Sequence, residues 1–168
     1  MVLTLTEWNA MSLEDAAAAV LPCCGSLAWA AKLAAERPFA SFEELSAASD
    51  TVWWTLPQSD WQQAFDSHPR IGQGHAKAAT EKSLAWSAGE QAAANPDEAA
   101  KAALREGNAR YEARFGRIFI VCATGKSAAE MLGILEQRLL NDDVTEMREA
   151  AEQQRLITQL RLRKWLAA

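Results

Sequence analysis

The chain has 168 residues, 49% of them hydrophobic, and this length predicts one globular domain spanning residues 1–168. Alanine is abundant, whereas only 8 glycines and 5 prolines occur, which favours helices over sheets. A formal net charge of −5 argues against nucleic acid as a partner, because such proteins neutralise phosphates with basic side chains. No stretch reaches the ~20 apolar residues of a membrane span, so no membrane contact is expected. The three cysteines suit neither a disulfide framework nor spaced zinc pairs, which favours a reducing compartment.

Four helices are predicted before residue 67, each from a start signal ahead of apolar residues at helical spacing. The start signals are Thr4 with Glu7, Ser26, Ser41 with Glu44, and Pro57. The first helix is expected to continue through the alanine run 16–19 to Pro22. The second should end at Arg37, because a residue before proline disfavours the α conformation.

The second half begins with a predicted loop at residues 66–76, which holds one proline and two glycines. Residues 77–94 are weakly helical, with a fresh start signal at Ser87. Three further helices are expected, and they run from the Asn95-Pro96-Asp97-Glu98 cap to Phe115, from Ser127 with Glu130 to Leu140, and from Asp142/Asp143 to the C-terminus. Residues 119–122 form the one strand-like run, which we interpret as a buried extended connector because it is too short to build a sheet. The prediction is an all-α fold, one compact domain of about seven to nine helices with one short extended connector.

Two histidines, His68 and His75, are the only ones in the chain, and both lie in the predicted loop. Imidazole is the side chain that can act as acid and base near neutral pH. Pro69 restricts the backbone after His68, which makes His68 the better catalytic candidate, with a surface loop histidine as the alternative. A metal site is not expected, because neither a His-Glu-x-x-His nor a Cys-x-x-Cys pattern occurs.

Ser87, Glu90 and Gln91 allow two interpretations. The three-residue spacing of Ser87 and Glu90 is that of a capping box, which would be purely structural. A helix N-terminus with hydroxyl, carboxylate and amide groups could also bind a polar, anionic small molecule. The residues alone leave these alternatives open.

Arg161 is the third candidate, within a helical run where Ile157 and Trp165 lie one turn to either side. An arginine on such an apolar stripe either extends its head group to solvent or pairs with a buried anion. Arg155 has polar neighbours at the same spacing and is expected to be a solvated charge. Arg161 is therefore the better candidate for binding a ligand.

Several motifs, taken together and in order, resemble the 2-oxo-4-hydroxy-4-carboxy-5-ureidoimidazoline (OHCU) decarboxylase family. The main ones are the loop at residues 68–72, the Ser87-x-x-Glu90-Gln91 turn and residues 119–127. The supporting segments are Cys24-Gly25-Ser26 with Trp29, Arg37-Pro38-Phe39, Asp60-Trp61, Asn108-x-Arg110-Tyr111-Glu112, Phe115-Gly116 and Leu160-Arg161-Leu162. Thr124 stands where the family more often has serine.

The resemblance implies an all-α, cofactor-free decarboxylase that converts OHCU to (S)-allantoin and CO2 in urate degradation. His68 would be the central acid and base, and Glu90 would bind the substrate and set the charge on His68. The implied substrate-binding residues are Pro69, Ser87, Gln91, Ile120, Val121, Cys122 and Arg161.

Two other functions stay open at this point. The chain could be a non-enzymatic helical module that binds a partner through a tryptophan-rich surface, which predicts scattered polar residues. It could also be a hydrolase of a ureido compound in the same pathway. The C-terminal Trp165-Leu166-Ala167-Ala168 is not a Ser-Lys-Leu address, which favours the cytoplasm. The oligomeric state is left open, with a homodimer as one alternative.

Overall fold

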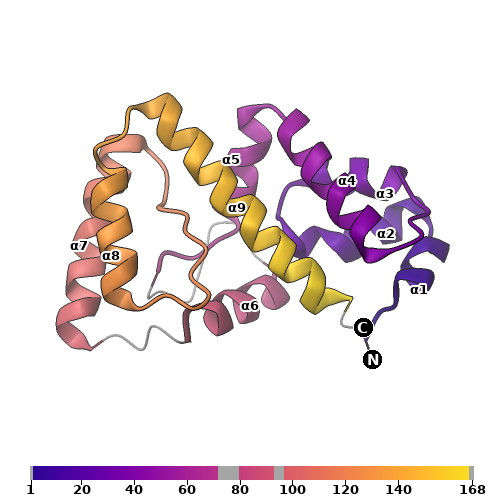
Figure 1. The fold of residues 1–168 in the computed structure, drawn as a ribbon, viewed down its shortest axis with the longest axis horizontal. Coiled ribbons are helices and arrows are strands. Elements are labelled where there is room, and N and C mark those ends of the chain that lie inside the picture. The colour runs from indigo at the N-terminus through magenta and orange to yellow at the C-terminus, as the bar shows by residue number, and fades with distance from the viewer. Residues whose placement is uncertain (1, 72–79, 93–96, 167–168) are drawn as a thin grey trace. The chain divides into compact units, whose positions relative to one another are not determined.

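The fold was obtained as a computed structural model that describes residues 2–71, 80–92 and 97–166. Within these residues it contains nine α-helices, one 3-10 helix and no strand (Figure 1). The helices are α1 Leu5–Ala10, α2 Leu13–Val20, η1 Leu21–Cys23, α3 Leu27–Ala35, α4 Phe42–Thr55, α5 Gln58–Asp66, α6 Glu81–Gln91, α7 Glu98–Phe115, α8 Ala128–Arg138 and α9 Asp143–Trp165. The all-α fold and the predicted number of helices are confirmed.

Two compact units can be distinguished along the chain. The first comprises residues 1–64 and 155–168, and the second comprises residues 65–154. Helices α5 and α9 each contribute residues to both units. One domain over residues 1–168 stays a prediction.

In the first unit, the prediction of one helix from Thr4 to Pro22 is wrong, because this segment forms two helices. Thr4 caps α1 with the predicted capping box, in which the Thr4 hydroxyl accepts from the Glu7 amide and the Glu7 carboxylate accepts from the Thr4 amide. Met11 then adopts an extended conformation, and Ser12 caps α2 by accepting a hydrogen bond from the Asp15 amide at 3.1 Å. Ser12 is a second start signal inside the apolar run, and it competes with helix continuation.

The other starts in the first unit agree with the sequence. Ser26 and Ser41 accept hydrogen bonds from the backbone amides three residues later and cap α3 and α4. The Glu44 carboxylate binds the amide of Ala40 rather than that of Ser41, so only half of the expected capping box forms. Pro57 precedes α5, and its carbonyl accepts from the Trp61 amide at 3.4 Å.

Tryptophans form the core of the first unit. The Trp8 ring meets Trp165 edge to face with 5.4 Å between centroids, and its indole donates to the Ala16 carbonyl at 2.9 Å. Trp29, Trp53 and Trp61 are buried as well. Five of the seven tryptophans are therefore core residues, which counts against a binding module with a tryptophan-rich surface.

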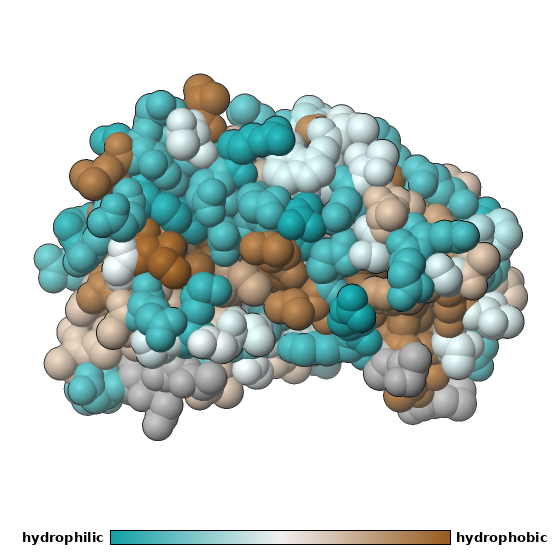
Figure 2. Space-filling model, in the orientation of Figure 1, coloured by the Kyte–Doolittle hydropathy of each residue, from teal (hydrophilic) through white to brown (hydrophobic). Residues whose placement is uncertain are grey.

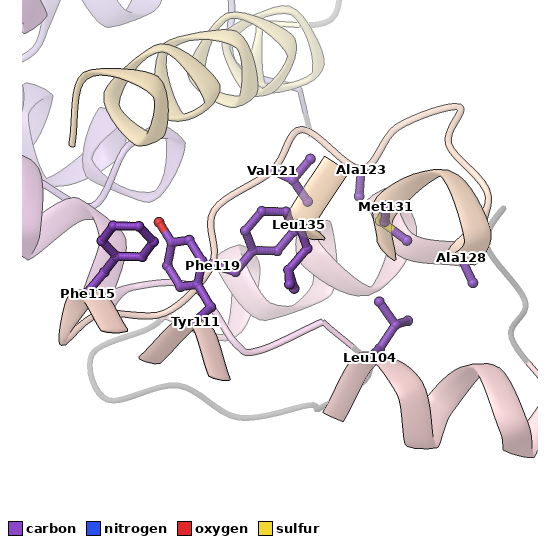
Figure 3. Packing of buried hydrophobic residues seen from close by; sticks show 9 residues of the cluster. All are labelled: Leu104, Tyr111, Phe115, Phe119, Val121, Ala123, Ala128, Met131 and Leu135. Atoms are coloured by element: carbon purple, nitrogen blue, oxygen red, sulfur yellow. The ribbon is translucent and has the colours of Figure 1, made fainter. Parts of the chain in front are cut away.

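The second unit packs α7 against α8, with the predicted connector beside them (Figure 3). Asp97 caps α7 by accepting from the Ala100 amide at 2.7 Å, and α7 ends at Gly116, whose positive φ of 72° favours glycine. Asn95 and Pro96 of the predicted cap lie outside the described residues. Ser127 caps α8, and Asp142 accepts from the Thr145 amide at the start of α9.

Aromatic and aliphatic side chains from α7, α8 and the connector point toward one another in Figure 3. The cluster consists of Leu104, Tyr111, Phe115, Phe119, Val121, Ala123, Ala128, Met131 and Leu135. Burial of this apolar surface fixes residues 119–123 in an extended path although they have no neighbouring strand in the described chain. The buried extended connector is confirmed.

The face shown in Figure 2 is mostly polar, with hydrophobic residues in several separate groups. The exposed large hydrophobic residues are Val2, Leu13, Leu27, Leu140 and Val144. None of the helices in the described ranges is long and apolar enough to cross a membrane.

Candidate active site

His68 lies just after the end of α5, where the chain leaves the helix. Its backbone amide donates to the Phe65 carbonyl at 3.1 Å, and its side chain is buried, with 8% of the residue exposed. The ring atom Nε2 is 2.6 Å from Oε1 of Gln154 on α9. The alternative of a solvated loop histidine is therefore wrong. His75 lies outside the described residues.

Gln154 is a residue that the sequence interpretation missed. It is fully buried, and its Oε1 lies within hydrogen-bond distance of Nε2 of His68. This contact fixes the orientation of the imidazole ring. The signal in the sequence was weak: Gln154 lies two helical turns before Arg161, on the same stripe.

The segment after His68 is anchored to α7. Pro69 is buried, and the Arg70 guanidinium binds the Glu112 carboxylate with Nε 2.9 Å from Oε2 and Nη2 2.6 Å from Oε1. The hydrogen bond with Glu112 raises the pKa of Arg70. This two-pronged contact holds the backbone that follows His68.

Ser87 and Glu90 do not form the expected capping box. The helix starts at Glu81, six residues earlier, where Thr80 caps it by accepting from the Ser83 amide at 3.0 Å. Ser87 and Glu90 therefore lie in the interior of α6, and the proposed anion site at a helix N-terminus is also wrong. The predicted helix start at Ser87 is wrong for the same reason, because Thr80 caps the helix.

The interior position gives Ser87 and Glu90 another common property. They are three residues apart on one face of α6, which also holds Ser83, and all three side chains are buried. Gln91 follows at the end of the helix and is half-buried. A buried carboxylate among hydroxyls is costly unless it interacts with other polar groups, so packing alone does not explain this polar face.

The connector holds Ile120, Val121 and Cys122, for which substrate contacts were predicted, and all three residues are buried. The Ile120 carbonyl accepts from Arg138 Nη1 at 2.5 Å. The Cys122 amide donates to Gln153 Oε1 at 2.9 Å, and its carbonyl accepts from Lys126 Nζ at 2.7 Å. Within the described part of the chain, the N–H of Ile120 and the N–H and C=O of Val121 make no hydrogen bond, so these backbone groups are available to a ligand.

Arg161 lies in the first unit and is fully buried, as its apolar stripe predicted. Its Nη1 is 3.4 Å from the Pro22 carbonyl. Burial raises the pKa of the nearby Cys24 thiol to about 12, although hydrogen bonds with Ser26 and Thr158 and, to a smaller extent, the positive charge of Arg161 lower it. Arg155 was expected to be solvated, but it is half-buried and pairs with Asp50 at 3.0 Å.

One open pocket of about 460 Å³ lies elsewhere, between α8 and α9 of the second unit. Its lining residues are Glu130, Gly133, Ile134, Gln137, Arg138 and Glu149. None of the predicted site residues lines it. In the described part of the chain, no group of three or more His, Cys, Asp or Glu side chains is arranged to hold a metal ion.

Within the second unit, a histidine and a carboxylate are buried on separate helical segments, and such groups are typical of an acid–base site for a small polar molecule. The family model for OHCU decarboxylase matches residues 9–163. The chain belongs to the OHCU decarboxylase family.

Individual relatives agree with this assignment. The chain is 36% identical over 144 residues to the uric acid degradation bifunctional protein TTL of Arabidopsis thaliana, covering 84% of this chain and 44% of that protein. It therefore spans less than half of the Arabidopsis protein. It is 33% identical over 129 residues to 2-oxo-4-hydroxy-4-carboxy-5-ureidoimidazoline decarboxylase of Amia calva, covering 75% of this chain and 73% of that protein.

Solved structures share the fold. A crystal structure described as OHCU decarboxylase in the presence of (S)-allantoin matches with a TM-score of 0.76 and 33% identity, covering 88% of this chain and 96% of that one. A structure of (S)-allantoin synthase, at 15% identity and a TM-score of 0.73, covers 98% of this chain and 54% of that one and shares the fold alone.

Proposed function

We propose that this protein decarboxylates OHCU to (S)-allantoin and CO2 without a cofactor. The observation that carries the proposal is the likeness to the OHCU decarboxylase crystallised in the presence of (S)-allantoin, which extends over 96% of that chain. The burial of His68, Ser87 and Glu90 supports it, because a non-enzymatic module has no need to bury these groups.

The chemistry needs positioning and one proton. When the carboxylate leaves as CO2, the electron pair of the broken bond passes to the adjacent imine and carbonyl of the substrate. We propose that His68 delivers a proton to one face of the substrate carbon that has lost CO2, and that Gln154 orients the imidazole ring. Glu90 hydrogen-bonds the substrate and sets the charge on His68, while Pro69, Ser87, Gln91 and the connector at Ile120, Val121 and Cys122 bind it. Exclusion of water strengthens each of these interactions.

The test follows freshly generated OHCU by circular dichroism, with and without the protein. We expect rapid formation of the (S) enantiomer of allantoin, together with CO2. A hydrolase of a ureido compound would instead release ammonia and a ring-opened acid. Absence of any acceleration over the spontaneous reaction would overturn the proposal.

Glu90→Gln is expected to lower turnover by about 100-fold, which lies within the usual range for loss of a group that supports acid–base catalysis. The isosteric amide keeps the shape of the side chain, and Glu90 lies too far along α6 to cap it, so the melting temperature should change little. Turnover and melting temperature are measured on one sample.

Glu130→Gln is the matched control, because Glu130 occupies the third position of α8 after its Ser127 cap and is exposed. It should leave turnover unchanged. Wild-type turnover in Glu90→Gln would remove Glu90 from the catalytic residues.

Arg161→Lys is expected to raise the Michaelis constant or lower turnover by the equivalent of about 2–3 kcal/mol, if Arg161 binds a substrate oxygen through a charge-assisted pair. Lysine offers one strongly hydrated charge in place of a planar fork. The measurement is steady-state kinetics with OHCU.

Arg163→Lys serves as its control, since Arg163 lies two residues further along α9, is exposed and stacks on Phe42. Arg155→Lys is less suitable, because Arg155 pairs with Asp50. If Arg161→Lys behaves like Arg163→Lys, Arg161 has a packing role only.

Three further proposals concern the protein as a whole. Residues 1–168 act as one decarboxylase-like helical domain, which the match of the family model over residues 9–163 supports. A cytoplasmic location and a homodimer stay predictions from the sequence, which cell fractionation and analytical ultracentrifugation test.

A further inference from the structure

A buried ionic cluster lies in the second unit, centred on Glu146 of α9. Its Oε1 accepts from Tyr111 Oη at 2.5 Å and from Arg138 Nε and Nη2 at 2.8 and 2.5 Å. Its Oε2 accepts from Asn141 Nδ2 at 3.0 Å. Burial first, and then the hydrogen bond to Glu146, raise the pKa of Tyr111, so the phenol stays a neutral donor. Every polar atom of the Glu146 carboxylate is therefore satisfied.

Arg138 joins this cluster to the connector. Two of its nitrogen atoms bind Glu146, and the third, Nη1, donates to the Ile120 carbonyl. The guanidinium also lies over the ring of Phe119, 4.6 Å from its centroid. A planar guanidinium group that is fixed on one side by a carboxylate can hold a carbonyl oxygen in one position on its other side.

The connector depends on such side-chain contacts, because no strand of the described chain pairs with it. A buried backbone without a ladder must find other partners. Arg138 binds the carbonyl before Val121, while Gln153 and Lys126 bind the amide and carbonyl of Cys122 after it. Of these three side chains Arg138 is the buried one, and Gln153 and Lys126 are half-buried.

We propose that Arg138 is a positioning residue, which holds the Ile120–Cys122 connector so that the Val121 peptide groups meet the substrate. This inference rests on the proposed function for its kinetic part only. It predicts that a weaker contact between Arg138 and the connector reduces substrate binding more than it slows the chemical step at His68.

Arg138→Lys tests the proposal, because lysine keeps the charge next to Glu146 but cannot reach Ile120 at the same time. With OHCU, KM should rise about tenfold, the effect of losing one charge-assisted hydrogen bond, while kcat falls less than threefold. Alkylation of Cys122 by iodoacetamide, followed by peptide mass spectrometry, should become about tenfold faster for the same reason. Cys23 and Cys24 are fully buried and act as internal references.

Arg117→Lys is the matched control. Arg117 is a buried arginine of the same unit that pairs with Asp143 at 3.5 Å and lies over Phe115, but it does not bind the connector. It should leave KM and the Cys122 labelling rate unchanged. Equal changes in both variants, or wild-type KM and labelling in Arg138→Lys, would overturn the positioning role.

A second variant covers the case in which Arg138→Lys does not fold. Glu146→Gln keeps the volume and the acceptor oxygen but weakens the hold on Arg138, so KM and labelling should shift in the same direction by a smaller factor. No shift in a folded Glu146→Gln protein would then contradict the proposal. Failure of the proposed function appears differently, as a wild-type protein that does not convert OHCU although Cys122 labelling still responds to Arg138→Lys.

Discussion

His68→Asn is expected to lower the rate of (S)-allantoin formation by about three orders of magnitude while the protein stays folded. The asparagine amide corresponds in position to Nδ1 of the ring and does not reach Gln154, which Nε2 contacts, so the stability of the variant is measured together with its activity. The amide cannot exchange a proton near neutral pH, and the residual allantoin should be close to racemic. Circular dichroism of the product and of the backbone, recorded on the same preparation, measures both effects.

His75→Ala is the natural control for this variant, because His75 is the other histidine in the chain. We expect it to retain most of the activity. Retention of activity and of stereospecificity in His68→Asn would exclude His68 as the proton donor. Loss of activity in both variants would instead point to the loop as a whole.

Glu146→Ala is expected to produce the largest loss of stability, about 3–5 kcal/mol in the free energy of unfolding. It removes the carboxylate that satisfies Arg138, Tyr111 and Asn141, and it leaves a guanidinium buried without its anion. Urea denaturation followed by tryptophan fluorescence gives the change. A loss below about 1 kcal/mol, typical of an exposed ion pair, would show that water solvates the cluster.

The double variant Arg138→Met with Glu146→Leu separates the effect of the ion pair on stability from the effect of burying two side chains at these positions. Apolar side chains of similar volume often replace a buried ion pair with little loss of stability, so the double variant should be more stable than Glu146→Ala alone. Its activity should remain low, because no group then holds the Ile120 carbonyl. A double variant that is stable but has low activity would show that Arg138 positions the connector in addition to packing against it.

Most of the fold could be predicted because helix boundaries depend on local chemistry. Ser26, Ser127 and Asp142 act as caps where the sequence indicated, and Gly116 ends α7 as expected. The errors arose where two start signals compete. Ser12 divides the first predicted helix, and Thr80 starts α6 before Ser87 can act as a cap.

The candidate site residues were chosen by residue type and local pattern, and their roles stay predictions, whereas their supporting contacts could not be predicted. Burial of Arg161 agrees with its apolar stripe, and His68 is buried rather than exposed on a surface loop. The bond between His68 and Gln154, and the one between Arg138 and Ile120, join residues 86 and 18 positions apart. No local pattern encodes such pairs, because they depend on tertiary packing rather than on spacing along one helix.

The three cysteines, none of which forms a disulfide, have a practical consequence for handling the protein. Thiolates, not thiols, react with oxidants and disulfides, and Cys23, Cys24 and Cys122 are all buried, with burial raising the pKa of Cys24 to about 12. Ageing by intermolecular disulfide formation therefore requires prior unfolding. The difference in titratable thiol between native and denatured samples then counts the folded molecules in a preparation, without substrate and without an assay of activity.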